Sequence, residues 1–422
     1  MSSEVESVDS FRIRAREWIG GHLDPRTSAP RAAQGTVTTE EEELAAVRRD
    51  RELQRSLFDA GLAGVCVPRD YGGQGLTPLH QQALNEELVG YEFPARIQVP
   101  TFSPCASVLL EFGSEETKHQ HLPAILKGEE LWMQLLSEPS GGSDVAGAQT
   151  TAVRDGDEWV LNGSKIWTSG AWWSDWGLCL VRTNWDVPKH RGLTVFILPL
   201  RQPGIDIHRI EMLDGSQEFC QEFITDVRVP DTDRIGDVDQ GWTVGTRWMF
   251  HERMLYSSPL VTRPPDSAQR GGHYASPVSV AAETGRLQDA RVRDLIGEGR
   301  MLELVSTQLS YRMSAGIRSG MISDQSAAVG RLFGGIAGAR GRTITFEIAG
   351  SAGVAWSEDD GDAKRCGIEF LMRQSSCIGG GTTEMARNVI SERVLGMPRE
   401  RSLDRDVPYR DVPRGPSPYS QP

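Results

Sequence analysis

The sequence predicts an α+β chain of several domains, with helical segments at both ends and a β domain between them. Residues 1–130 carry apolar residues at helical spacing. Residues 131–235 instead carry short apolar runs with period-two alternation, separated by Asp-Gly, Asn-Gly and Pro-Gly turns, which is typical of antiparallel strands. Helical spacing returns over residues 236–400. The segment 401–422, rich in Pro, Arg and Asp, is expected to be a disordered tail.

The first part is expected to contain mainly helices and turns. The first helix has candidate N-caps in Asp9 and Ser10, and Gly61 is expected to end the second helix. Residues 25–38 show no periodicity and are expected to form a flexible connection. Four segments have helical spacing, namely residues 8–23, 40–60, 78–89 and 115–126.

Apolar runs mark the strands of the β part, and helical spacing follows them. The clearest runs begin at Trp159, Leu178, Leu193 and Phe219. Beyond Gln240, the helical segments are residues 242–257, long stretches within 282–355, and residues 383–394. The Pro- and Gly-rich stretch 263–280 is expected to be a loop.

Charge and cysteine usage exclude several classes of function. The chain has 58 Asp and Glu against 45 Lys and Arg, a net charge of -13, which argues against nucleic acid or an anionic membrane as the main partner. The six cysteines contain no C-x-x-C pair, so we expect reduced, mostly buried thiols and no metal site. The N-terminus lacks an apolar signal region, and no apolar run reaches the roughly 18 residues of a membrane helix. We therefore expect a cytoplasmic protein.

Two polar loops are suited to holding a flat ligand. At Gln134–Val145, an apolar run breaks into a Ser/Gly loop, whose backbone amides can face a ligand and whose glycines allow close approach. At Asn162–Gly170, a turn leads into Trp167 and two hydroxyl residues. Together the loops are consistent with one wall of a cofactor pocket. The alternatives are ordinary surface loops and, for Trp167, an aromatic side chain packed in the sheet.

Three longer motifs follow one another along the chain. They are Leu136-Ser-Glu-Pro-Ser-Gly-Gly-Ser-Asp-Val, Asp155-Gly-Asp-Glu-Trp-Val-Leu-Asn-Gly-Ser-Lys-Ile-Trp-Thr-Ser-Gly and Gly380-Gly-Thr-Thr-Glu-Met-Ala-Arg-Asn. In sequence, order and spacing they resemble the acyl-CoA dehydrogenase family, from about residue 40 to residue 400. The resemblance implies an N-terminal helical domain, a β-barrel-like central domain and a C-terminal four-helix bundle. It also implies FAD, shared across the interface of a dimer or tetramer.

The resemblance further implies α,β-desaturation of acyl-CoA or another acyl thioester, with electrons leaving to an electron-transferring flavoprotein. This chemistry needs a base at the α-carbon, donors that polarise the thioester carbonyl, and a flavin N5 facing the β-carbon. By resemblance, Ser143 meets the CoA arm. The residues expected at FAD are Gln134, Leu136 and Ser137 along one flavin edge, Trp167, Thr168 and Ser169 over the isoalloxazine, and Thr382 and Glu384 near the diphosphate or adenylate.

The catalytic base is where this chain departs from much of the family. Many members carry a glutamate before a Gly-Thr pair near the C-terminal end, but the matching residue here is Gly380, which cannot take a proton. Its backbone N–H is still expected to hold the thioester oxygen. A minority of the family places the glutamate on a helix just after the β domain. In this sequence, Glu252 matches that glutamate. The resemblance places the neighbouring cation Arg253 beside the substrate.

Helical spacing partly supports Glu252 as the base. It lies on the margin of an apolar helix face, where partial desolvation raises the pKa of a carboxyl and makes it a better base. The alternative is a solvated glutamate that is paired to Arg253 or to nothing. His251 is the rival titratable group, although it lies nearer the centre of the face and is expected to be packed.

Other departures concern the subunit interface. Glu347 and Glu384 stand where glutamine is frequent in the family, and residues 282–320 contain no Arg-x-x-Phe-Gly. These features resemble a bacterial subset with a Gly-Gly-Thr-x-Glu ending, some of which work as heteromers of two paralogous chains. The alternatives to a complete dehydrogenase are therefore a non-catalytic or half-site partner subunit, and a flavin oxidase or monooxygenase on the same scaffold.

Overall fold

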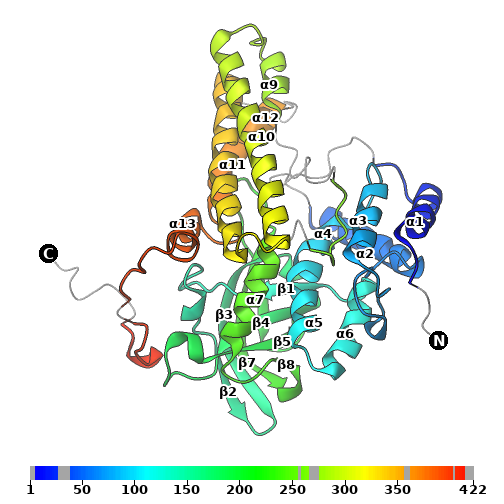
Figure 1. The fold of residues 1–422 in the computed structure, drawn as a ribbon. Helices are drawn as coiled ribbons and strands as arrows, with labels where there is room; N and C mark the ends of the chain where they lie inside the picture. Colours follow the sequence, from blue (N-terminus) through cyan, green and yellow to red (C-terminus); the bar gives the residue numbers. More distant parts are fainter. Residues whose placement is uncertain are drawn as a thin grey trace, which may run out of the picture.

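In the computed structural model, a column of helices stands on a lower body made of the N-terminal helices and the β-sheet (Figure 1). The structure describes residues 5–26, 39–254, 258–265, 275–355, 362–402 and 404–413. Helices come first along the chain, strands second and helices last. The predicted α+β order is thus confirmed.

The N-terminal part contains the four predicted helices. Its elements are α1 (Val8–His22), α2 (Glu40–Asp59), α3 (Pro78–Glu87), α4 (Ala95–Ile97), a π-helical segment (Gln98–Ala106), α5 (Ser107–Phe112) and α6 (Glu115–Leu126). The predicted cap of α1 was wrong, because Ser7 rather than Asp9 or Ser10 accepts the hydrogen bond, from the Ser10 N–H at 3.2 Å. Gly61 follows the end of α2 with a φ of 66°, a conformation that favours glycine. Most of the predicted connection 25–38 lies outside the described residues.

The middle of the chain forms one eight-stranded sheet. Its strands are β1 (Trp132–Leu135), β2 (Thr151–Asp155), β3 (Glu158–Ser169), β4 (Trp176–Arg182), β5 (Leu193–Pro199), β6 (Ile205–Arg209), β7 (Phe219–Pro230) and β8 (Arg234–Ile235). The strand order is β6-β7-β3-β2-β4-β5-β8, and β1 pairs with β4. Most pairs are antiparallel as predicted, whereas β1 and β2 each run parallel to β4.

Both faces of the sheet are buried at β4 and β5. Along β4, Leu178 and Leu180 enter a core shared with the N-terminal helices, whereas Cys179 and Val181 enter a second core between the strands. Alternate side chains of β4 therefore pack into two different apolar cores, one on each face of the sheet. Each fully buried side chain of this kind stabilises the fold by about 1.5–3 kcal/mol, so the sheet is a rigid base for the loops at its edge.

The C-terminal helices divide between the lower body and the column. They are α7 (Gly241–Arg253), α9 (Pro277–Glu283), α10 (Ala290–Arg318), α11 (Ala327–Ala349), α12 (Asp362–Leu371) and α13 (Thr383–Val389). Figure 1 shows α9 to α12 side by side in the column, with α10 and α11 along its length. Helix α7 packs instead against β5, α5 and the π-helical segment, and its Val244 and Trp248 lie in the core of the lower body. Residues 255–257 at the predicted end of this helix lie outside the described residues.

The predicted disordered tail, residues 401–422, was wrong for part of its length. Residues 404–413 fold back onto the β domain, where Tyr409 is 5% exposed. Its hydroxyl donates to the carbonyl oxygen of Gly147, and its ring stacks on Trp185 with the centroids 5.3 Å apart. One aromatic anchor orders a segment whose composition suggests disorder. The end of the tail lies outside the described residues.

Two further predictions concern the thiols and the membrane. All six cysteines are free thiols, and four of them are buried, which confirms the prediction. No helix within the described ranges combines the length and the apolar character that crossing a membrane requires. The same ranges hold no group of three or more His, Cys, Asp and Glu side chains placed to bind a metal ion.

Candidate active site

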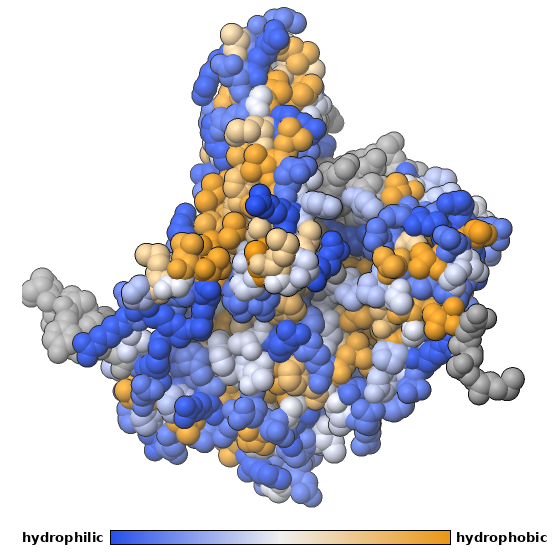
Figure 2. Space-filling model, viewed as in Figure 1, coloured by the Kyte–Doolittle hydropathy of each residue, from blue (hydrophilic) through white to orange (hydrophobic). Residues whose placement is uncertain are grey.

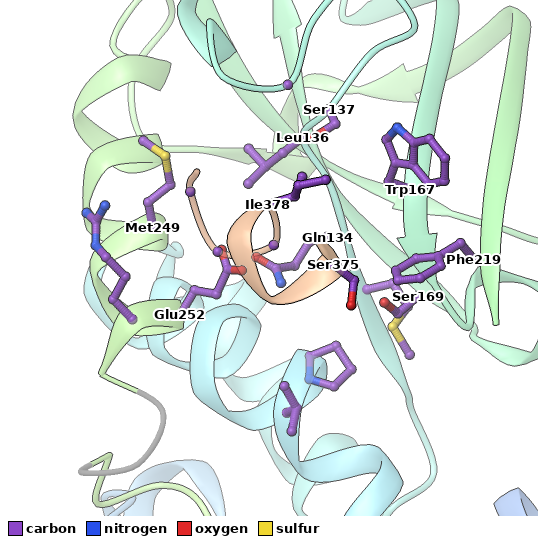
Figure 3. Close-up of a pocket in the computed structure, with 18 of the residues that line it drawn as sticks. Gln134, Leu136, Ser137, Trp167, Ser169, Phe219, Met249, Glu252, Ser375 and Ile378 are labelled. Carbon is purple, nitrogen blue, oxygen red and sulfur yellow. The ribbon is translucent and has the colours of Figure 1, made fainter. Parts of the chain in front are cut away.

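A cavity of about 1790 Å3 opens where the sheet, the N-terminal helices and the foot of the column meet (Figure 3). Its walls come from β1 and the loop after it, the end of β3, α7, α11, and residues 375–382, which we call the glycine loop. Most of the residues predicted for the site line this one cavity. They are Gln134, Leu136, Ser137, Ser143, Trp167, Ser169, Glu252, Arg253, Gly380 and Thr382.

A buried ion pair holds the loop after β1 from behind. The Glu138 Oε1 and Lys165 Nζ atoms are 2.8 Å apart, and neither side chain has more than slight contact with solvent. Glu138 also accepts the backbone N–H groups of Gln149 and Thr150, at 2.6 and 2.9 Å. Burial opposes ionisation, but Lys165 and these hydrogen bonds outweigh it and lower the pKa of Glu138. The neighbouring Ser137 is thereby fixed at the cavity wall.

Trp167 presents its indole to the cavity. It has a φ of 67°, lies at a register shift between β3 and β7, and is 51% exposed. Its ring meets Phe219 edge to face, with the centroids 6.0 Å apart (Figure 3). A bulky residue with positive φ is uncommon and strained, and such strain clusters at ligand sites. The alternative of an aromatic packed inside the sheet is therefore wrong.

Thr168 does not share this placement. Its side chain is 3% exposed, and its hydroxyl donates to Glu222 Oε2 at 2.9 Å inside the sheet. The expectation that the Thr168 side chain covers the flavin is not met, because neighbouring residues of a strand point to opposite faces. Ser169, one residue on, lines the cavity. Burial raises the pKa of Glu222 to about 8.

Glu252 leaves the last turn of α7 and points toward the glycine loop (Figure 3). Its Oε1 atom lies 3.9 Å from the position that a Cβ atom would take on Gly380. Burial raises the pKa of Glu252, and the cations Arg253 and Arg331 act in the opposite direction. The carboxyl is thus a desolvated acid–base group within the cavity, as predicted from its place on the helix.

His251 is tied elsewhere. Its Nε2 atom is 2.8 Å from Glu111 Oε1, and Arg247 donates to both oxygens of the same carboxylate. The hydroxyl of Ser103 donates to the His251 carbonyl oxygen at 2.8 Å, which fixes this turn of α7 to the π-helical segment. His251 does not line the cavity, so of these two candidate bases only Glu252 faces it.

The glycine loop closes the cavity opposite the sheet. Gly380 has a φ of 69°, a conformation that suits glycine. Thr382 caps α13, because its hydroxyl accepts the Met385 N–H at 3.1 Å, and it also lines the cavity. Glu384 lies outside, where it is exposed and pairs with Arg387 at 3.2 Å. Within this chain, Glu384 is therefore not positioned to touch a cofactor in the cavity.

Some lining residues have no counterpart among the predictions. Arg331 of α11, Phe219 of β7 and Met249 of α7 all line the cavity. Phe219 is half-buried at the start of β7, where its ring meets Trp167, and Met249 lies one turn before Glu252 on α7. The spacing of Met249 and Glu252 on one helix indicates that both side chains could face the cavity. Arg331 lies on another helix and reaches the cavity only through tertiary packing.

Known proteins resemble this chain in sequence. Family models for the acyl-CoA dehydrogenase N-terminal and middle domains match residues 21–129 and 134–227. Acyl-CoA dehydrogenase FadE26 of Mycobacterium tuberculosis is 30% identical over 359 residues, which cover 83% of this chain and 88% of that protein. This chain belongs to the acyl-CoA dehydrogenase family. Another member, acyl-CoA dehydrogenase IpdE1 of the same organism, is 29% identical over 396 residues, 94% of this chain and 99% of that protein.

Solved structures of the acyl-CoA dehydrogenase fold match this chain over nearly its whole length. The Tcur3481-Tcur3483 steroid ACAD is 26% identical with a TM-score of 0.72, covering 94% of this chain and 100% of that chain. The ChsE4-ChsE5 complex from Mycobacterium tuberculosis is 25% identical with a TM-score of 0.68, covering 95% and 100%. The predicted fold class is thus confirmed.

The cavity residues fit the flavin that the acyl-CoA dehydrogenase family implies. A flavin needs an apolar or aromatic surface for its ring and a few polar groups at its edge. The half-exposed indole of Trp167 supplies the first, and the hydroxyls of Ser137 and Ser169 supply the second. Trp167 leaves a large aromatic surface open inside the cavity, and its backbone is strained. A stacked flavin ring would cover that surface.

Proposed function

We propose that this chain is an FAD-dependent acyl-CoA dehydrogenase that desaturates an acyl thioester between its α- and β-carbons, with Glu252 as the base. The observation that carries the proposal is the half-buried Glu252 carboxyl, which lies at the cavity beside Gly380 and has a raised pKa. When bound, FAD would supply the acceptor for the β-hydrogen of the substrate, which leaves as hydride.

The chain's own residues would bind the reactants from opposite walls. Trp167 and Ser169 would hold the flavin from the β3 side, and Ser137 would meet its edge. Ser143 is exposed at the mouth of the cavity, where the polar CoA arm would lie. The apolar side chains farther in include Leu136, which faces the interior in Figure 3 and would keep water from the reacting carbons.

Glu252 would take the α-proton on a carboxylate oxygen. Because burial raises the pKa of this carboxyl, it binds the proton more strongly than a solvated glutamate does. The Gly380 N–H would hold the thioester oxygen, where negative charge develops as the proton leaves. That role requires no side chain, so a glycine at this position is compatible with activity.

Exposed apolar side chains on the column support an assembly of several chains. Over its 29 residues α10 buries only Val292 and Leu295. Its exposed apolar residues are Met301, Leu304, Val305 and Tyr311. Figure 2 shows such side chains along the visible face of the column. Patches of this kind mark interfaces, and we propose a homodimer, a homotetramer or a heteromer with a paralogous chain.

The names of the two solved structures described above each pair two proteins, which favours the heteromer among these assemblies. Under the half-site alternative, this chain would complete its cofactor site only with a partner. The presence of Glu252 in the cavity favours a chain that carries its own catalysis. Electrons would then pass to an electron-transferring flavoprotein.

Purification of the full chain alone tests the proposed function. We expect a yellow protein with bound FAD, anaerobic bleaching of the flavin by acyl-CoA, and release of the enoyl thioester. Screening an acyl-CoA panel would then identify the acyl group. A colourless chain that gains FAD only when a paralogue is co-expressed would favour the half-site subunit. Oxygen consumption without an added acceptor would favour an oxidase or monooxygenase.

A further inference from the structure

Arg331 brings an incompletely paired positive charge to the reaction centre. It projects from α11, and its Nη1 atom donates to the carbonyl oxygen of Ser376 in the glycine loop at 2.9 Å. Its Nε and Nη2 atoms are buried, and neither has a hydrogen-bond partner within the described part of the chain. A buried guanidinium with two unpartnered nitrogens is costly, so its charge requires compensation by a nearby anion.

The Glu252 carboxylate is placed to supply that compensation. A Cβ atom built on Gly380 would lie 3.9 Å from Arg331 Nε and 3.9 Å from Glu252 Oε1. The Nε and Oε1 atoms are therefore at most twice that distance apart. In a partly desolvated site, opposite charges at this range interact appreciably without a direct hydrogen bond.

Two cations lower the pKa of Glu252, and the neighbouring Arg253 acts more strongly than Arg331. Arg253 is exposed to solvent and also interacts with the carboxylate of Asp324, whereas the Nε and Nη2 atoms of Arg331 are buried. The π-helical segment presents the thiol of Cys105, whose pKa is raised by its burial and which is therefore neutral. Cys377 is the other group that interacts electrostatically with Arg331.

We propose that Arg331 is a positioning residue for dehydrogenation, whose buried charge keeps the Glu252 carboxylate ionised and ready to take the α-proton. This inference rests on the proposed role of Glu252 as the base. Arg331 touches neither substrate nor flavin in this account, and it acts through Glu252 and through the glycine loop that its Nη1 atom holds. Loss of the charge should leave Glu252 protonated up to a higher pH.

The pH profile of anaerobic flavin reduction by acyl-CoA separates this electrostatic role from a structural one. In Arg331→Met holoenzyme, the acid limb of the profile should move to higher pH. Arg331→Lys keeps the charge, and its acid limb should stay close to that of the unmodified protein. Arg342→Met is the matched control, because Arg342 on the same helix donates to the carbonyl oxygen of Arg373 and does not line the cavity. It should lose thermal stability while its acid limb stays in place.

An acid limb of Arg331→Met that overlies the unmodified profile would overturn the inference. If the methionine variant does not retain FAD, Arg331→Gln replaces it, since it removes the charge and keeps a donor for Ser376. The same shift is expected there, and an unshifted limb again overturns the inference. Failure of the proposed function is distinguishable, because Glu252→Gln would then reduce its flavin at the unmodified rate.

Discussion

The Oε1 atom of Glu252 lies 3.9 Å from the point that a Cβ atom would occupy on Gly380. By resemblance, position 380 is where many family members carry their base. The carboxylate here reaches that place from α7 instead, and the glycine leaves room for it. Gly380 also has a φ of 69°, which a residue with a side chain adopts only with strain. Glu252 and Gly380 therefore form one arrangement, in which the proposed base and the proposed backbone donor come from different elements.

The buried carboxyl of Glu222 should make the protein less stable as the pH rises. Burial raises its pKa from 4.5 to about 8, so near neutral pH the folded state holds a proton that the unfolded chain releases. Because the folded pKa is the higher one, its contribution to stability is fully present below pH 4.5 and is lost as pH rises through about 8. Glu222→Gln keeps an acceptor for the Thr168 hydroxyl and cannot ionise.

Thermal unfolding of Glu222→Gln and the unmodified protein across this pH range checks the prediction. The unfolding midpoint of the variant, relative to that of the unmodified protein, should increase as the pH rises. Two midpoint curves that run parallel over the whole range would contradict it.

Removal of one partner of the buried ion pair behind the loop after β1 should be strongly destabilising. Lys165→Met leaves the Glu138 carboxylate buried without its cation, and such a loss costs about 3–5 kcal/mol. Chemical denaturation measures the change in the free energy of unfolding. Adding Glu138→Gln to Lys165→Met should recover part of the loss, because the remaining group is neutral. A single variant that loses less than about 1 kcal/mol would show that the pair is not the anchor of this loop.

The docked tail should stabilise the fold and the loop that we propose for the CoA arm. Tyr409 packs under the guanidinium of Arg182 at 4.0 Å and bonds the Gly147 carbonyl oxygen. Tyr409→Ala should cost about 3–5 kcal/mol of stability, whereas Tyr409→Phe should cost about 1 kcal/mol through the lost hydrogen bond. Because Gly147 follows the loop that carries Ser143, the alanine variant should also raise KM for acyl-CoA with little change in kcat. Equal stabilities of the two variants would contradict the docking role.

Local patterns predicted the elements because helix and strand periodicities depend on neighbours in the sequence. The four N-terminal helices and the antiparallel strands follow from spacing alone, and the motifs placed Ser137, Trp167 and Glu252 around one cavity. Thr168 was assigned to the flavin together with its neighbours, although strand alternation places its side chain on the other face. Three consecutive residues of one strand cannot share one wall.

Long-range packing explains what the sequence did not reveal. Arg331 comes within electrostatic range of Glu252 only through the tertiary packing of the chain, and no local pattern links α11 with α7. The tail has a composition typical of disorder, yet Tyr409 finds a pocket formed by residues far away in the chain. Composition reports the average tendency of a segment, whereas one buried aromatic contact decides its structure.

The most direct test of Glu252 as the base is anaerobic reduction of the flavin in Glu252→Gln by acyl-CoA. Glutamine keeps the size of the side chain and cannot take the α-proton, so FAD should stay bound while bleaching is abolished. Retained flavin absorbance in the purified variant shows that the cofactor site is intact. Loss of bleaching with FAD bound is the result that the account predicts. Bleaching at the rate of the unmodified protein would contradict it.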